Sequence, residues 1–340
     1  MRKIFKTILL LFISLLIEAQ VNEYKPLIVK GEESWDKPQE IYSDVIISGR
    51  STLAISSVIS FASEAKIIIQ PGGQLILDGG KLTNLCPEYW QGIEVRGAPN
   101  SDNPDDQGKL IMKNDATIEN VLVGVRNIFA DEVLHYGGMI QASNSHFINN
   151  QVAVQLESTR YNRTNAYVSY FYFCDFETNA DYQGTNSFKY FADLDHVNDV
   201  VFNHCDFANS QSEYTGIGIK AKEAQFTVNN NSTFENLGYA IQNYGSGSSI
   251  GSVIKKSYFT NNYRGIYTSG VNEMEIYDNE FSIPYASEPS TKSHGIYLDR
   301  CDGYIVETNE FESYTPSNKG AVRLSKNLPA YQQKMLNKKP

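Results

Sequence analysis

The chain repeats one short pattern of apolar and polar positions, and each copy has an apolar anchor residue between polar neighbours. In the copy Ser257–Asn261 the anchor is Phe259, and the small-plus-aliphatic pair Gly265-Ile266 begins six positions after it. Repeats of this length are typical of solenoids, in which every turn of the chain packs on the one before it. We therefore expect buried anchors in vertical register. They are spaced by 22 to 31 residues, and they are Ile118, Phe147, Phe176, Phe207, Phe234, Phe259, Phe281 and Phe311.

A second apolar residue precedes most anchors by five positions, as Ile276 precedes Phe281. In a straight strand this odd interval would place the two side chains on opposite faces. Polar residues such as Asp278, which tolerate a left-handed turn, lie between them. The interval therefore predicts a bend with both apolar residues inside. Two positions before the anchor stand small or amide side chains, which we expect to hydrogen-bond along the stack: Ser145, Cys174, Cys205, Ser232, Ser257, Asn279 and Asn309.

A Pro-Gly-Gly turn at residues 71–73 separates two apolar runs, which by themselves are compatible with a β-hairpin. Similar phrases recur downstream at residues 108–112 and 138–142, each leading to the next anchor. Because this short sequence motif returns once per repeat, we favour a solenoid over isolated hairpins.

The two ends of the chain differ from the repeats. Residues 1–19 combine a basic start with an apolar run from Ile8 to Ile17, which predicts a secretory signal peptide. The run is too short to favour a permanent membrane span, so none is expected after cleavage. We assign residues 20–66 to an N-terminal cap and first coil, 67–324 to the repeats, and 325–340 to a polar tail.

In the motifs Asn279-Glu280-Phe281 and Gly265-Ile266 the chain resembles the right-handed parallel β-helix proteins of the pectin-lyase-like superfamily. It is similar in particular to the secreted β-helix repeat proteins of Bacteroidetes, whose coils carry N-x-F-x-N and G-I motifs. The resemblance covers roughly residues 67–324 and implies an all-β, single-domain solenoid of about ten coils. Enzymes, adhesins and phage spikes share this scaffold, so the resemblance does not specify an activity.

Composition narrows the range of partners. The 22 tyrosines and 17 phenylalanines favour strands. The formal net charge of −10 argues against nucleic acid and anionic lipid surfaces as partners. A polyanionic glycan would need a local basic patch or a bridging cation.

Tyrosines, amides and carboxylates occupy outward positions beside the anchors and after the small-aliphatic pairs. Aromatic rings beside polar side chains suit a sugar-binding surface, because rings pack on sugars while amides and carboxylates hold hydroxyl groups. An ordinary solvated β-surface explains the same pattern, and both readings stay open. We predict that an extended polysaccharide or surface glycan binds along one outward face that includes Gln242, Tyr258, Tyr267, Glu280 and Tyr297.

Two pairs of carboxylates are candidate calcium ligands. Asp175 and Asp206 stand in consecutive repeats, and the resemblance to pectate lyases implies that such carboxylates hold calcium between protein and polyuronate. Asp193 and Asp195 belong to the densest acidic cluster, which we place on or beside a loop. A solvated acidic loop is the alternative for this cluster.

Cys174 and Cys205 each stand two positions before the anchor in consecutive repeats, so we expect them to be stacked neighbours. A disulfide between them and two free core thiols both fit this placement. The spacing of Cys86 and Cys301 does not suggest zinc.

Two classes of function remain. The first is a secreted or surface β-helix protein that binds carbohydrate and is not an enzyme. The second is a calcium-assisted polysaccharide lyase or, further from the pattern, a glycoside hydrolase. The hydrolase motifs depart from the polygalacturonase set, because Pro104-Asp105-Asp106 lacks a preceding Gly and Ser293 stands where that family has Gly before His294. We can assign no catalytic residue, and we prefer the first class.

Overall fold

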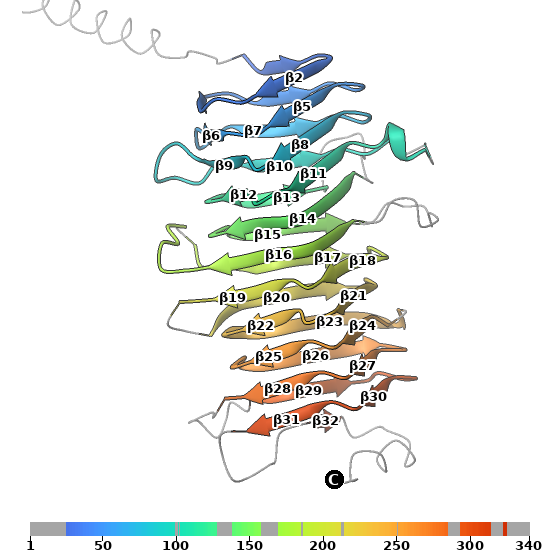
Figure 1. The fold of residues 1–340 in the computed structure, drawn as a ribbon. Coiled ribbons are helices and arrows are strands. Elements are labelled where there is room, and N and C mark those ends of the chain that lie inside the picture. Colours follow the sequence, from blue (N-terminus) through green and yellow to red (C-terminus); the bar gives the residue numbers. More distant parts are fainter. Residues whose placement is uncertain are drawn as a thin grey trace, which may run out of the picture.

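The structure is a computed structural model that describes residues 25–98, 101, 103–127, 138–157, 169–184, 186–211, 214–249, 251–284, 293–313 and 322–324. The predicted signal peptide at residues 1–19 and the predicted tail at 325–340 lie outside the described residues. The strands stack one above another into a long column (Figure 1).

The described chain winds through three parallel ladders, which we name A, B and C. All strand pairs are parallel, and each strand pairs with its equivalent one coil away. Ladder A contains twelve strands: β1 (Leu27–Val29), β4 (Val45–Ile47), β7 (Lys66–Ile69), β10 (Gly92–Val95), β13 (Val123–Arg126), β15 (Val152–Glu157), β17 (Tyr190–Asp195), β20 (Thr215–Lys222), β23 (Leu237–Ser249), β26 (Arg264–Val271), β29 (His294–Asp299) and β32 (Val322–Leu324).

Ladders B and C share the long strands β14 (Met139–Ile148) and β16 (Tyr170–Thr178). Ladder B also contains β2 (Glu32–Trp35), β5 (Thr52–Ile55), β8 (Gln74–Asp78), β11 (Lys109–Lys113), β18 (Val200–Asn203), β21 (Phe226–Asn229), β24 (Val253–Lys255), β27 (Glu275–Tyr277) and β30 (Ile305–Glu307). Ladder C also contains β3 (Gln39–Ile41), β6 (Val58–Phe61), β9 (Lys81–Asn84), β12 (Ala116–Glu119), β19 (Asp206–Asn209), β22 (Thr233–Glu235), β25 (Tyr258–Thr260), β28 (Glu280–Ile283) and β31 (Glu310–Ser313).

The chain is therefore an all-β parallel β-helix, as the sequence predicts. A short 3-10 helix, η1 (Pro104–Asp106), precedes β11. The apolar runs on either side of the Pro-Gly-Gly turn belong to β7 and β8, which lie in different ladders, so they do not form a hairpin. Strands β1 to β6 fall within the stretch predicted as cap and first coil, and they pair in the same three ladders.

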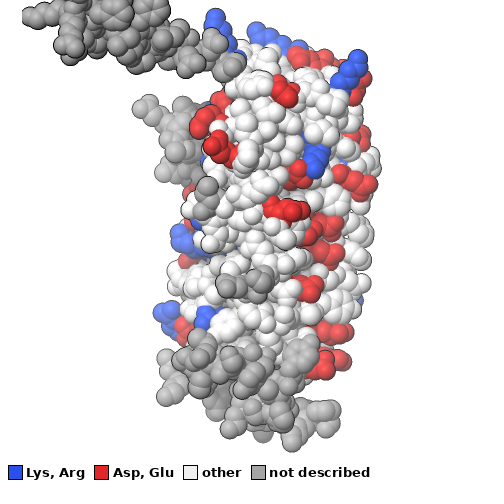
Figure 2. Space-filling view, turned by 90° about the vertical axis from the view of Figure 1, so that its left-hand side faces the viewer, with Lys and Arg blue, Asp and Glu red and all other residues white. Residues whose placement is uncertain are grey.

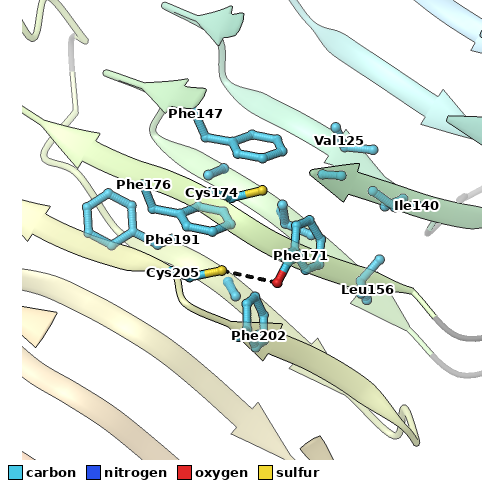
Figure 3. Close-up of a cluster of buried hydrophobic side chains, with 14 of the residues drawn as sticks. Val125, Ile140, Phe147, Leu156, Phe171, Cys174, Phe176, Phe191, Phe202 and Cys205 are labelled. Carbon is cyan, nitrogen blue, oxygen red and sulfur yellow. Dashed lines mark hydrogen bonds between the residues drawn. The ribbon is translucent and has the colours of Figure 1, made fainter. Parts of the chain in front are cut away.

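The predicted anchors form one continuous stack inside ladder C. The phenylalanines pair in direct register, with ring centroids 4.5 to 4.9 Å apart and planes within 12° of parallel. They are buried except for Phe311 at the end of the stack, which is partly buried. Phe171 and Phe202 of ladder B start a second stack beside it (Figure 3).

The predicted bend lies three positions before each anchor, where the backbone is left-handed. Asn144 and Asp278 fit the expected residue types, but Phe173, Lys256 and Thr308 adopt the same conformation. The stack stabilises this corner in most coils, because the backbone N–H groups of five corner residues donate to the next coil: Asp115, His204, Asn231, Lys256 and Asp278. The positions are Asp115, Asn144, Phe173, His204, Asn231, Lys256, Asp278 and Thr308, with φ between 46° and 62°.

The small and amide side chains next to the corner hydrogen-bond between coils, as predicted. Asn279 accepts from the backbone N–H of Ser257 (3.1 Å) and donates to the carbonyl of Ile254 (3.0 Å). Asn309 accepts from the backbone N–H of Asn279 one coil further on (3.1 Å). Each amide thus satisfies backbone groups that the corner leaves unpaired.

A steric constraint explains the small residue near the start of many ladder A strands. A Cβ atom at Gly265 would lie 2.3 Å from the carbonyl oxygen of Gly295 and 3.1 Å from the ring of Phe281. A Cβ at Gly124 would similarly lie 2.4 Å from the carbonyl oxygen of Ala153. Adjacent coils are therefore in backbone contact at this point.

Cys174 and Cys205 are stacked neighbours, as predicted, because the residues on either side of them pair in register. Both are buried and free, and the Cys205 thiol points at the carbonyl oxygen of Phe171 (3.1 Å; Figure 3). Burial raises the pKa of the Cys205 thiol well above its usual value, and the neighbouring Cys174 thiol raises it further.

Truncating one anchor tests the stack. We expect Phe234→Ala to lower the free energy of unfolding by about 3–5 kcal/mol, because it removes two ring contacts and leaves a cavity between coils. Tyr258→Ala, an exposed aromatic on the next strand of ladder C, is the matched control and should cost far less. Denaturant unfolding followed by circular dichroism measures both, and equal losses would contradict a buried stack.

Thiol titration tests the cysteine placement. In the native protein we expect one fast-reacting thiol, Cys86, which is exposed, because the other three are buried. Under denaturing, non-reducing conditions all four should react with an aromatic disulfide reagent. A denatured count of two would instead show that Cys174 and Cys205 are bonded.

Candidate functional site

The five residues predicted to bind carbohydrate lie in two different ladders. Gln242, Tyr267 and Tyr297 follow one another in direct register on β23, β26 and β29 of ladder A. Tyr258 and Glu280 pair on β25 and β28 of ladder C. The prediction of a single shared face is therefore wrong, because the chain turns a corner at the left-handed Asn261 between Tyr258 and Tyr267.

Four tyrosines gather on ladder A, and we name Tyr239, Tyr244, Tyr267 and Tyr297 the tyrosine patch. The rings of Tyr267 and Tyr297 stack with centroids 5.3 Å apart and planes 3° from parallel. Tyr239 meets Tyr267 edge-on at 6.0 Å, and Tyr244 contacts it at 5.8 Å. These rings reach the same surface because Ala240 and Ile241, between Tyr239 and Gln242, are both buried.

The stacking decides what the patch presents to a ligand. The rings of Tyr267 and Tyr297 face each other, so the surface exposes their edges and hydroxyl groups. The Tyr267 hydroxyl is protonated at neutral pH and can donate a hydrogen bond, and burial, the neighbouring tyrosines and Asp299 raise its pKa further from that range. Tyr244, which is 38% exposed, offers a more accessible ring at the side of the patch.

A small polar network borders the patch next to Tyr244. Ser269 lies in register between Tyr244 and Asp299, and its hydroxyl donates to the Asp299 carboxylate (3.1 Å). Arg300 Nε donates to the same carboxylate (3.1 Å). Asp299 is thereby held in an ion pair.

A polar column continues from the patch along ladder A toward the N-terminal coils. Lys220 precedes Gln242 in register, and Asp193 precedes Lys220. Lys220 Nζ lies 3.0 Å from Asp193 Oδ1 and 4.6 Å from the centroid of the Tyr190 ring. The patch and the column together place polar or aromatic side chains at equivalent positions on successive coils of ladder A. Asp193, Gln242, Tyr267 and Tyr297 are the predicted residues among them.

The predicted metal ligands have other partners. Asp175 and Asp206 are in register, as expected, but the Asp175 carboxylate is 2.7 Å from His146 Nδ1, and Thr233 donates to Asp206 (2.7 Å). A group of three or more His, Cys, Asp or Glu side chains that could hold a metal does not occur among the described residues. Calcium at this pair stays a prediction.

Asp193 and Asp195 of the acidic cluster lie at the end of strand β17, beside the turn at residues 196–199. Asp193 and Asp195 are paired by lysines of the next coil, Lys220 at 3.0 Å and Lys222 at 3.4 Å. His196 contacts Asp195 as well. A place beside a loop agrees with the prediction, although the extra length of this coil lies between β16 and β17, before the cluster.

A groove runs along ladder C over its last described coils. Its lining includes Phe281 and Phe311, whose rings belong to the anchor stack, and its volume is about 330 Å³. The walls contain three carboxylates without an ion-pair partner in the described part of the chain, so the groove repels anions. The lining residues are Tyr258, Thr260, Glu280, Phe281, Ser282, Glu310, Phe311 and Glu312. Figure 2 shows carboxylates recurring along the length of the molecule.

One buried ion cluster escaped the sequence analysis. Glu94 of β10 is 6% exposed and binds three cations: Lys66 (2.9 Å), Arg96 (3.0 Å) and Arg126 (3.3 Å). Burial by itself raises the pKa of Glu94, but the hydrogen bonds from Lys66 and Arg96 outweigh it, so the net shift is downward. One feature of the repeat could have indicated this cluster. Arg126 lies in the row of outward residues that follows the small-aliphatic pairs, and Glu94 has the equivalent position one coil earlier.

Comparisons with known proteins give no family and a distant structural likeness. No protein-family model matches the chain, and no curated protein matches it. Among solved structures, the surface protein and adhesin PfbA of Streptococcus pneumoniae is similar at 10% sequence identity and a TM-score of 0.31, over 86% of this chain and 91% of that chain. A likeness at this level does not transfer a ligand. In the described part of the chain, no helix is long and apolar enough to cross a membrane.

Acid titration tests the Glu94 cluster. We expect Glu94→Gln to destabilise the protein at neutral pH, because Lys66, Arg96 and Arg126 would then repel one another. The pKa of Glu94 is lowered on folding, so its stabilisation is complete above the ordinary value of 4.5 and is lost as the pH falls through the lowered value.

The melting temperatures of wild type and variant should therefore converge in acid. Glu33→Gln, at an exposed glutamate, is the control and should leave the pH profile unchanged. A constant difference between wild type and Glu94→Gln at every pH would count against the cluster.

Proposed function

We propose that the chain is a secreted or cell-surface β-helix protein that binds an extended carbohydrate along ladder A and is not itself an enzyme. The observation that carries this proposal is the stacked pair Tyr267 and Tyr297 in register with Gln242. Three successive coils thus present a polar or aromatic side chain at the same position on one face. This arrangement matches a ligand that is itself a linear repeat.

The spacing supports this orientation of the ligand. Coils are separated by about 4.8 Å, which is close to the length of one sugar residue in an extended chain. A polysaccharide lying along the solenoid axis therefore meets one coil per sugar. The phenol and amide groups offer hydrogen bonds to sugar hydroxyls, while the edges of the rings and the exposed ring of Tyr244 supply apolar contact.

The surroundings of the patch support binding without catalysis. Asp299 is engaged by Arg300 and Ser269, so it is not poised as a free acid or base. Ser293, before His294, departs from the hydrolase motif of the β-helix family that the chain resembles. The predicted signal peptide at residues 1–19 supports a location outside the cytoplasm.

Binding measurements on the secreted form test the proposal. We expect a panel of extended polysaccharides to include a ligand whose longer oligomers bind better than its monomer, because successive coils contribute together. The variant Tyr267→Ala/Tyr297→Ala should weaken binding roughly 5-fold per ring, equivalent to about 1 kcal/mol each. Isothermal titration calorimetry measures both effects.

Tyr258→Ala is the matched control, since it removes an exposed tyrosine from ladder C and leaves ladder A intact. Loss of binding in this control with retention in the double variant would move the site to the ladder C groove. Release of unsaturated sugars in the presence of calcium would overturn the non-enzymatic assignment in favour of a lyase.

A further inference from the structure

Arg264 lies at the edge of the tyrosine patch and has an unusual environment. It is the first residue of β26, in register between Tyr239 of β23 and His294 of β29. Its guanidinium carbon is 4.6 Å from the centroid of the Tyr239 ring and 5.4 Å from that of Tyr263. Two tyrosine rings therefore hold a cation next to the surface proposed to bind carbohydrate.

This arginine lacks the kind of carboxylate partner that Arg126 and Arg300 have. Arg126 pairs with Glu94, and Arg300 pairs with Asp299. Within the described ranges no acidic side chain pairs with Arg264, and its Nε is buried without a hydrogen-bond partner. An unsatisfied buried donor on a charged group costs folding free energy. The local structure thus retains a cation that has no ion-pair partner among the described residues and one buried donor, Nε, that is unpaired.

We propose that Arg264 is a recognition residue for an anionic group, a carboxylate or a sulfate ester, on the glycan bound at the tyrosine patch. This inference rests on the proposed function and specifies the chemical class of its ligand. The planar guanidinium donates two parallel hydrogen bonds to such a group. The flanking rings of Tyr239 and Tyr263 restrict its orientation, so little side-chain freedom is lost on binding.

The position of Arg264 fits a ligand that spans the patch. Tyr239 connects it to the stacked pair, because the Tyr239 ring contacts both Arg264 and Tyr267. Asp299 lies at the opposite edge of the patch, in register with Tyr244, which is five residues or about 16 Å of extended strand from Tyr239. An anionic substituent held at Arg264 therefore stays away from this carboxylate.

Charge elsewhere on the molecule favours the same face. The chain carries a formal net charge of −10, and the groove of ladder C is lined by Glu280, Glu310 and Glu312. An anionic glycan is repelled there, whereas Arg264 attracts it on ladder A. Direct contact with a guanidinium also makes a bridging metal ion unnecessary, which separates this mode from the calcium-dependent binding expected of pectate lyases.

A matched set of ligands tests the inference: a neutral β-glucan oligosaccharide and its carboxylated and sulfated forms, titrated with and without a chelator. We expect at least one charged form to bind wild type roughly tenfold more tightly than the neutral form, because charge-assisted hydrogen bonds are strong. The chelator should have no effect, and the preferred form identifies the group.

Arg264→Gln should abolish this preference, which is read as the ratio of the affinities for the charged and the neutral form. Arg264→Lys keeps the charge but loses the planar fork, so it should retain an intermediate preference. The matched control is Lys255→Gln, which removes a cation 5.7 Å from the Tyr277 ring in ladder B, and it should behave as wild type. Melting temperatures verify that every variant is folded.

The outcomes separate the two proposals. Binding of the neutral form together with an unchanged charge preference in Arg264→Gln would overturn the role of Arg264 and leave the tyrosine patch standing. A charge preference that disappears with chelator would overturn it in favour of a bridging cation. Failure of all three oligosaccharides to bind wild type would overturn the role of Arg264 in recognising a charged glycan, whereas the tyrosine patch is overturned only if the whole polysaccharide panel fails to bind.

Discussion

The structure depends on the in-register stacking of coils through parallel backbone ladders. The hydrogen-bonded strands set the spacing between coils, and the anchor rings, 4.5 to 4.9 Å apart, stack at that same spacing. Backbone pairing and core packing therefore require one geometry, and neither is strained to satisfy the other. The outward residues inherit the register, so a column such as Gln242, Tyr267 and Tyr297 arises from the core pattern.

Much of the fold is predictable because the repeat records which side chains face inward. The position of each anchor phenylalanine within its repeat predicts that the anchors pair in register. The shared position of Cys174 and Cys205 likewise predicts that they are neighbours. The left-handed corner at Phe173 and Thr308 is harder to predict, because neither residue type favours it. At these positions the residue shares the left-handed conformation of the equivalent residues in the adjoining coils.

The candidate site is less predictable. The position of a residue within the repeat indicates whether its side chain points into the core or toward solvent, but it does not indicate which ladder an outward residue belongs to. Tyr258 and Tyr267 both point outward, yet the corner at Asn261 places them in different ladders. The pairing of Asp193 with Lys220 depends on which coils are adjacent. Arg264 stands just before the Gly-Ile pair, at a position where the repeat has no fixed residue type, and its contacts with Tyr239 and Tyr263 emerge only from the packing.

The ladder geometry also has a mechanical consequence. Hydrogen bonds between coils lie parallel to the long axis of the column, so a pull on one end loads the terminal coil first. Each coil that peels away releases 22 to 31 residues, or about 70–110 Å of extended chain, while the coils behind it keep their contacts. A protein tethered at one end can thus dissipate tension in discrete steps, and its remaining coils stay folded under load.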